Sequence, residues 1–446
     1  MRSIFSFILV LSIVAGCSSE DIILNEPTTT IEYKYLTHNQ WIYAQMNRNY
    51  LWREDMPDSL DCDYGLTPPD FFKHLLSPKD KFSYLTNNST YHPANAYNYG
   101  IAYQMYSDIK GNHAIQILYT TSEEAKSYGI RRGDFFQIVN KLPYSIILEK
   151  VLLDNNGAFV KKDCHEIELS RFPLSSNSTV IVDTIYHIDN KAIGYLCYTQ
   201  YDKISDLYPP LKKFSDNQIS DLILDLRYNP GGYVSTCRFL CNCIVPKEGY
   251  NQVFQQCSYN DILSDYYKKT TGEERTFTYF DDLTEMADNT LGTQMVSLNL
   301  RRIYILTSSH TASASEATII CLRPYMDVSI IGEPTVGKGV GSWTISDNEY
   351  KYALQPITMR YYNANGESTP DGGIIPDYFI PDGYFTREKD LGDTEEPLLH
   401  QAMQLICPNL FPTSMVCIKN QAEKQLLTPV GVPSFIIEYN QKHNRR

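Results

Sequence analysis

The segment from residue 190 to 385 most constrains the fold, because apolar runs and helix-like stretches alternate along it. Runs typical of buried strands lie at 193–198, 221–226, 301–306, 328–332 and 352–361. Stretches of helical character lie between them, at 205–214, 233–243 and 311–322. This alternation predicts a mixed or parallel sheet with crossover helices. Pro209-Pro210 is expected to break the first helix, and the polar stretch 247–300 is expected to be an irregular excursion.

The sequence on either side of this core has a different character. Residues 31–90 carry apolar side chains near helical spacing, and a Pro-Pro-Asp start at 68–70 suits a helix N-terminus, so a small helical cap is expected. Residues 95–180 combine glycine with alternating apolar residues, which predicts a β module. Residues 386–446 are expected to form a tail with one helix at 396–406. The fold class is therefore a multidomain α+β and α/β chain.

The N-terminal residues have the pattern of an export signal. Met1-Arg2 precedes an apolar run at 4–14, which is too short to span a bilayer. The run ends in Val14-Ala15-Gly16-Cys17, which resembles a bacterial lipobox. The resemblance implies a signal peptide at 1–16, a lipid on Cys17 and a polar tether at 17–30. The expected location is the cell envelope, with the chain anchored in the outer membrane and facing the periplasm or the surface. An ordinary signal peptide with an incidental cysteine is the alternative.

Charge and cysteine spacing exclude other classes of function. The formal net charge is −13, from 39 basic and 52 acidic residues, and no basic stripe is present, so no nucleic-acid partner is expected. Cys237, Cys241 and Cys243 are spaced C-x3-C-x-C, without the second pair or the histidines of a zinc site. They are expected to be small buried hydrophobic side chains. The sequence therefore predicts no metal site and no cofactor.

Two strand ends in the predicted core carry residues suited to catalysis. The segment 229–232, Asn-Pro-Gly-Gly, follows a buried strand, and paired glycines let backbone N–H groups approach a ligand. The segment 307–316 is rich in small hydroxyl side chains and opens a helix. A serine at a helix N-terminus lies near free N–H groups, which stabilise an alkoxide and an oxyanion. A plain turn and ordinary helix capping are the structural alternatives.

A serine nucleophile at this position needs a base. No G-x-S-x-G motif surrounds the serines, and His310 is so close in sequence that it is expected to be a loop residue. The alternative base is a lysine that burial keeps neutral, because burial lowers its pKa. Lys338 follows the strand at 328–332, and Gly337 and Gly339 on either side of it allow the chain to fold it inward.

Four motifs together resemble those of the C-terminal processing peptidases, also called tail-specific proteases. They are Leu226-Arg227-Tyr228-Asn229-Pro230-Gly231-Gly232, Ser313-Ala314-Ser315-Glu316, Gly332-Glu333-Pro334-Thr335-Val336-Gly337-Lys338-Gly339 and Gly373-Ile374-Ile375-Pro376-Asp377. The separation of 25 residues between Ser313 and Lys338 also matches the family. The resemblance covers residues 95–385 and implies a serine peptidase core at 190–385 of the crotonase/ClpP-like type.

The resemblance also implies a role for individual residues. Ser313 would attack the scissile carbonyl, and Lys338 would accept its proton. The N–H of Ala314 and an N–H of Gly231 or Gly232 would form the oxyanion hole. Gly231 is favoured because it is the first glycine after the strand.

The chain departs from the family at one position. Many members have a glutamine four residues after the lysine, where it orients the base, and this chain has Ser342. The shorter hydroxyl implies that Ser342 or another group positions Lys338, or that activity is weaker. The expected function is a serine endopeptidase acting on polypeptides. A weak or inactive peptide-tail-binding lipoprotein of the same fold and an esterase-like acyl-transfer enzyme are the alternatives.

The β module at 95–180 resembles a PDZ domain. The similarity rests on the loop Tyr99-Gly100-Ile101-Ala102, a helix at 122–128 and the turn Gly129-Ile130-Arg131-Arg132-Gly133-Asp134. PDZ domains bind a peptide C-terminus by strand addition and hold its carboxylate on loop N–H groups. The resemblance implies that the loop selects substrates by their C-terminal tails. The loop lacks the second glycine usual in the family, and an unrelated small β module is the alternative.

Overall fold

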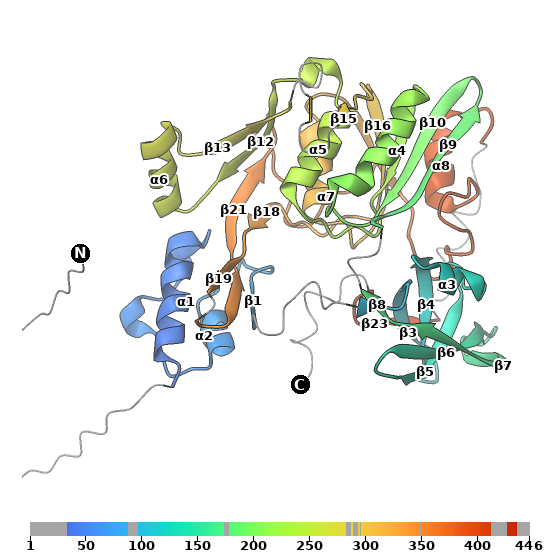
Figure 1. Cartoon of the computed structure of the whole chain (residues 1–446), viewed down its shortest axis with the longest axis horizontal. Helices are drawn as coiled ribbons and strands as arrows, with labels where there is room; N and C mark the ends of the chain where they lie inside the picture. Colours follow the sequence, from blue (N-terminus) through green and yellow to red (C-terminus); the bar gives the residue numbers. More distant parts are fainter. Residues whose placement is uncertain are drawn as a thin grey trace, which may run out of the picture.

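The computed structural model describes residues 34–87, 97–173, 178–281, 287–288, 293–294, 296–347, 349–411 and 426–434. The predicted signal peptide, Cys17 and the tether lie outside these residues. The described chain forms a helical cap, a central α/β core with a projecting arm, and a β module (Figure 1). Among the described helices, none combines the length and the apolar composition needed to cross a membrane.

A six-stranded sheet forms the core and confirms the predicted mixed topology. Its order is β22-β17-β16-β11-β10-β9, and every neighbouring pair is parallel except β10 with β9. The strands are β9 (Val180–Ile188), β10 (Lys191–Tyr198), β11 (Asp221–Asp225), β16 (Arg302–Thr307), β17 (Asp327–Gly332) and β22 (Tyr378–Phe379). Side chains alternate along β11, so Leu222 and Leu224 join one hydrophobic layer and Ile223 joins the other.

Helices cover both faces of this sheet. On one face pack α4 (Ile204–Asp216), α5 (Val234–Ile244) and α7 (Ala314–Leu322), and on the other packs α8 (Pro397–Ile406). All nine residues of α7 are buried. Cys237, Cys241 and Cys243 on α5 are fully buried and free, as expected for hydrophobic rather than ligating cysteines.

Three expectations for residues 190–385 are wrong. Helix α4 continues through Pro209 and Pro210, because its apolar face buries Leu207, Leu211 and Phe214 against the sheet and this packing outweighs the lost backbone hydrogen bonds. The run 352–361 forms two strands, β20 (Tyr352–Gln355) and β21 (Ile357–Tyr362), on either side of a proline. The stretch 247–300 holds regular elements: β12 (Val253–Ser258), α6 (Asp261–Thr271) and β13 (Thr276–Tyr279).

The projecting arm connects the core to the helical cap (Figure 1). Its sheet has the order β13-β12-β21-β18, with β18 at Val340–Ser342. The cap consists of α1 (Leu36–Asn49), α2 (Pro68–His74) and β1 (Tyr84–Asn87), and β1 pairs with β20, which in turn pairs with β19 (Ile345–Asp347). Val340, Leu354 and Ile357 of the arm are buried against α1 and α2 in one hydrophobic cluster.

The β module is an antiparallel sheet with one short helix. Its order is β23-β3-β4-β5-β6-β7, from β3 (Ile101–Ser107), β4 (His113–Thr120), β5 (Phe135–Lys141), β6 (Ser145–Leu153), β7 (Phe159–Ser170) and β23 (Thr428–Val430). Helix α3 (Glu123–Ser127) follows β4, and its first turn is capped by Ser122, whose Oγ accepts from the N–H of Ala125 at 3.1 Å. The C-terminal segment thus returns to cover the edge of β3, a pairing that the sequence did not predict.

Candidate active site

Ser313 lies in a strained turn between β16 and α7. Its backbone has φ 58° and ψ −113°. The N–H of Ser315 donates to the carbonyl of Ala312 at 3.1 Å and closes the turn. This geometry is that of the first central residue of a type II′ turn, which glycine normally occupies. A non-glycine residue here costs on the order of 1–3 kcal/mol, and such strain persists mainly at functional sites.

Glu316 joins the turn of Ser313 to the segment that carries Lys338. Its Oε2 accepts from the N–H of Ser313 at 2.7 Å and from the N–H of Lys338 at 2.9 Å. Its Oε1 accepts from the N–H of Gly337 at 2.7 Å and from the hydroxyl of Thr335 at 2.5 Å. Burial raises the pKa of Glu316, although these four donors oppose the rise. One buried carboxyl group therefore fixes the spacing between the predicted nucleophile and the predicted base.

The side chain of Lys338 points toward the helical cap. Its Nζ lies 5.4 Å from the centroid of the Phe82 ring. Burial lowers the pKa of Lys338, and the carboxyl groups of Glu316 and Asp80 partly oppose this effect. A lysine with a lowered pKa has a larger neutral fraction near neutral pH, as a general base requires.

Tyr361 on β21 holds the same two backbone segments from the other side. Its hydroxyl lies 3.2 Å from the carbonyl oxygen of Ser313 and 3.0 Å from that of Lys338. Burial raises the pKa of this phenol well above its ordinary value, so it keeps its proton as a donor. Glu316 and Tyr361 thus position both functional residues through their main chains.

The glycine turn predicted for the oxyanion hole lies against Ser313, the predicted nucleophile. A Cβ on Gly231 would lie 2.8 Å from Cβ of Ser313 and 2.9 Å from N of Ala314, so only glycine fits there. The N–H of Gly231 donates to Oδ1 of Asn229 at 2.9 Å. The N–H groups of Gly232 and Ala314 have no acceptor among the described residues. This arrangement favours Gly232 over Gly231 as the partner of Ala314.

Two other candidate residues, Ser342 and His310, form hydrogen bonds with groups other than Lys338. The hydroxyl of Ser342 accepts from Nε2 of Gln355 at 3.0 Å. His310 lies in the loop before the nucleophile turn, as expected, and its N–H donates to Oγ of Ser308 at 3.1 Å. Burial, with a smaller contribution from Arg387, lowers the pKa of His310 to about 4, so its ring is neutral at neutral pH.

The predicted peptide loop, Tyr99 to Ala102, precedes and begins β3. Gly100 has φ +70°, and its N–H donates to Oδ1 of Asn98 at 3.1 Å. Ile101 and Ala102 are buried, and Ala102 belongs to the hydrophobic cluster that extends into the core. The outer edge of β3 pairs with β23, in which Val430 lies opposite Met105. The structure therefore places this loop at the junction of the β module and the core.

A buried charge cluster lies directly beside the glycine turn. Its members are Arg132, Asp225, Arg227, Asp382, Arg387 and Glu396. Asp382 accepts from Nη2 of Arg132 at 2.7 Å and from the hydroxyl of Tyr228 at 2.7 Å. Although burial opposes it, the three neighbouring guanidinium groups hold the pKa of Asp382 well below its ordinary value. Because Arg132 belongs to the Gly-Asp turn of the β module, this cluster connects that module to the core.

The sequence analysis included Glu316 in a family motif but assigned it no role. It did not predict that Phe82, Tyr361 or the charge cluster would belong to the site. Glu316 had a local signal, since its position three residues after a helix-opening serine is that of a capping box. Phe82 and Tyr361 had no such signal in the sequence, because only the folded cap and arm bring them to the site.

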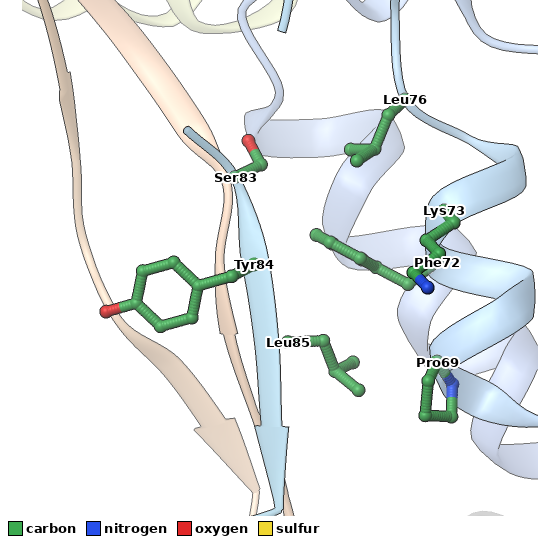
Figure 2. A pocket seen from close by; sticks show the side chains of 7 residues that line it. All are labelled: Pro69, Phe72, Lys73, Leu76, Ser83, Tyr84 and Leu85. Carbon is green, nitrogen blue, oxygen red and sulfur yellow. The ribbon is translucent and has the colours of Figure 1, made fainter. Parts of the chain in front are cut away.

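A hollow on the described surface lies in the cap, away from this centre. Figure 2 shows it between α2 and β1, where Leu85 and Phe72 face each other and Tyr84 points to the other side of the strand. The hollow has a volume of about 130 Å³. No group of three or more metal-ligating side chains occurs within the described ranges.

Comparison with known proteins gives the family. Residues 192–380 match Peptidase family S41, and residues 37–84 match the Peptidase S41 N-terminal domain. The chain is 27% identical over 213 residues to a carboxy-terminal-processing protease of Bartonella bacilliformis, covering 46% of this chain and 43% of the relative. It is 24% identical over 224 residues to the carboxy-terminal processing protease CtpA of Bacillus subtilis, covering 49% and 42%. The alignments thus span less than half the length of these two relatives.

A crystal structure of a Bacteroides fragilis protein classed with the S41 proteases has the same fold. It aligns with a TM-score of 0.69 at 24% identity, over 82% of this chain and 96% of that one. The two segments matched by the family models lie in the core and the cap. The chain belongs to Peptidase family S41, a family of serine peptidases that includes the carboxy-terminal processing proteases.

Proposed function

We propose that the chain is a serine endopeptidase that hydrolyses polypeptides through Ser313 and Lys338. The observation that carries the proposal is the shared carboxyl group of Glu316, which binds the backbone of a strained serine and of a buried lysine. The N-terminus of α7 behind Ser313 adds the N–H of Ala314, which has no acceptor among the described residues, where negative charge would develop.

The chemistry follows from the roles of these groups. Oγ of Ser313 attacks the carbonyl carbon while the neutral amine of Lys338 accepts the hydroxyl proton. The N–H groups of Ala314 and Gly232 stabilise the oxyanion of the tetrahedral intermediate. The ammonium then gives its proton to the leaving amine, and a water molecule deprotonated by Lys338 hydrolyses the acyl-enzyme.

The test is cleavage of an unstructured polypeptide with an apolar C-terminal tail by the chain from residue 18 onward. We expect Ser313→Ala and Lys338→Ala each to lower kcat by at least about a thousandfold with unchanged folding. Activity of the native chain should fall on acidification, as Lys338 becomes protonated. Full cleavage by both variants would rule out this mechanism.

A second candidate is a weak or inactive protein that binds peptide tails without cutting them. The observation that favours it is Ser342, which binds Gln355 and makes no described contact with the base. A fluorophosphonate probe separates the two functions, since covalent labelling of Ser313 requires an activated nucleophile. Labelling that is absent from the native chain would favour the binding function.

Substrate selection and location complete the proposal. The PDZ-like loop at 99–102 would recognise C-terminal tails, and a lipid on Cys17 would hold the chain in the cell envelope, at the outer membrane. Metabolic labelling with a radioactive fatty acid should mark the native chain and leave a Cys17→Ala variant unlabelled. Peptides captured by an inactive variant from the envelope should share related C-terminal residues.

A further inference from the structure

A turn of the helical cap lies directly over the predicted base. Phe82 is far from Lys338 in sequence, yet its ring centroid lies 5.4 Å from Nζ of that lysine. The ring also packs in the hydrophobic cluster that the cap shares with the arm. The cap therefore contributes one wall of the site that surrounds the lysine amine.

The turn that presents this ring is held in place by hydrogen bonds. Oδ1 of Asp80 accepts from the N–H of Phe82 at 2.8 Å and from the N–H of Ser83 at 2.9 Å. Oδ2 of Asp80 accepts from the hydroxyl of Tyr50 at 2.8 Å, and Oγ of Ser83 accepts from the N–H of Ile357 at 2.8 Å. The turn is thus fixed to α1's C-terminal end and to strand β21 of the arm.

Among the described residues, three titratable groups face Lys338 or its backbone from the elements around it. Glu316 comes from α7 and Asp80 from the cap, and both carboxyl groups favour the ammonium form. Tyr361 from β21 stays a neutral phenol. Burial opposes the two carboxyl groups and outweighs them, since the pKa of Lys338 is lowered. The amine therefore depends on the apolar surface that covers it, and Phe82 supplies that surface from the cap.

We propose that Phe82 is a positioning residue whose ring covers Nζ of Lys338 and keeps water from the amine. The proposal rests on the proposed function of Lys338 as the base. The face of an aromatic ring also attracts an ammonium, which acts in the opposite direction. Burial is the largest influence on the pKa of this lysine, so we expect the exclusion of water by the ring to outweigh this attraction.

The experiment compares pH profiles of kcat/KM for variants of the full chain. Phe82→Ala exposes the amine to water and should raise the pKa of Lys338. The acidic limb of the kcat/KM profile should then move to higher pH, and kcat/KM at a fixed pH on that limb should fall about tenfold. Phe82→Leu keeps apolar cover and should stay within about twofold of the native chain. Asp80→Asn keeps an acceptor for the turn but removes a charge, so its limb should move to lower pH.

Phe72→Ala is the matched control. Phe72 is 3% exposed in the same cluster of the cap, so its loss should destabilise the cap without moving the limb. A Phe82→Ala limb that coincides with that of the native chain would overturn the proposal. So would an equal shift in the Phe72→Ala control, because the effect would then reflect general destabilisation.

A second measurement separates this proposal from the proposed function. Trace acetylation of Lys338 at a series of pH values, read by mass spectrometry, reports the neutral fraction of the amine without any hydrolysis. If the chain hydrolyses no polypeptide but the acetylation profile of Lys338 differs between the native chain and Phe82→Ala, the proposed function fails and the role of the ring stands. Identical acetylation profiles in the native chain and Phe82→Ala would contradict it.

Discussion

At the scale of single residues, the site is organised by groups that act through the main chain. Glu316 and Tyr361 bind backbone atoms of Ser313 and Lys338, so both side chains remain available for chemistry. Charge-assisted hydrogen bonds to a buried carboxylate are about twice as strong as neutral ones, which suits a clamp made from a single side chain. Removal of that charge should therefore affect geometry more than packing.

Glu316→Gln is the variant that tests this clamp. An amide can accept at only one of its two ends, so two of the four donors would lose their acceptor. We expect kcat/KM to fall by about a hundredfold or more and the free energy of unfolding to fall by about 1–3 kcal/mol. Glu333→Gln is the control, since Glu333 follows strand β17 and its carboxyl group accepts from the N–H and the hydroxyl of Ser309 at 3.3 and 3.4 Å, longer than the bonds of Glu316. An active Glu316→Gln enzyme would contradict the clamp.

His310 should make the fold sensitive to acid. Its pKa is lowered from an ordinary value of 6.5 to about 4, so the unfolded chain binds the proton more tightly between these values. The contribution of His310 to stability is then present above pH 6.5 and is lost as the pH falls toward 4. Between pH 7 and pH 5 the loss should be roughly 2 kcal/mol. Urea unfolding of His310→Gln at both pH values should show a smaller difference, and an unchanged difference would assign the acid sensitivity elsewhere.

At the scale of elements, local pattern predicted most strands of the core and several elements around it, including the helices at 122–128 and 396–406 that appear as α3 and α8. Runs such as 221–226 and 328–332 appear within one residue as β11 and β17, because a buried strand needs a continuous apolar run. Helix α4 differs because its prolines are outweighed by packing that only the folded sheet provides. The pairing of β23 with β3 could not be predicted from the local sequence, because strands that are far apart in sequence find their partners only in the complete fold.

The residues of the proposed catalytic pair could be predicted from motif spacing, whereas the residues that surround them could not. Ser313 and Lys338 lie in contiguous motifs, whereas Phe82 reaches the lysine from a different part of the chain. The choice between Gly231 and Gly232 also required the structure, because it depends on one hydrogen bond to Asn229. Sequence patterns identify reactive groups, but the groups that tune them come from tertiary contacts.

The β23 strand gives a prediction about tail recognition. Thr428, Pro429 and Val430 pair antiparallel with β3, so a peptide that adds to this edge must displace them. A chain that ends after Leu427 keeps that fully buried leucine in its cluster and frees the edge. If β23 is paired in more than about nine-tenths of molecules, affinity for an apolar C-terminal peptide should rise at least about tenfold. Unchanged affinity, measured by fluorescence anisotropy, would place tail binding at another surface.

At the scale of the whole molecule, one buried charge cluster connects parts that are distant in sequence. Arg132 of the β module, Arg227 of the core and Glu396 at the start of α8 meet around Asp382. Replacing buried ion pairs by apolar groups is often neutral, but removing one partner leaves an uncompensated charge. Asp382 is the shared partner of three arginines, so its loss should affect the entire assembly.

Asp382→Asn should lower the free energy of unfolding by about 3–5 kcal/mol, because three buried guanidinium groups lose a counter-charge. Asp371→Asn is the control: Asp371 pairs with Arg360 at 3.3 Å, and its side chain is 79% exposed. Its loss should change stability by less than about 0.5 kcal/mol. Thermal and urea unfolding measure both, and equal effects would show that the cluster does not stabilise the fold.

The strained turn at Ser313 has a practical consequence for capturing substrates. Alanine at this position keeps the Cβ that opposes φ 58°, whereas glycine accepts the type II′ geometry without strain. Relief of about 1–3 kcal/mol exceeds the 0.5–1 kcal/mol that glycine's added freedom costs, so Ser313→Gly should melt higher than Ser313→Ala. Under the proposed function, the inactive glycine variant would then bind polypeptides in a more stable protein than the native chain. The backbone angle of Ser313 that suits the proposed nucleophile therefore lowers the stability of the fold.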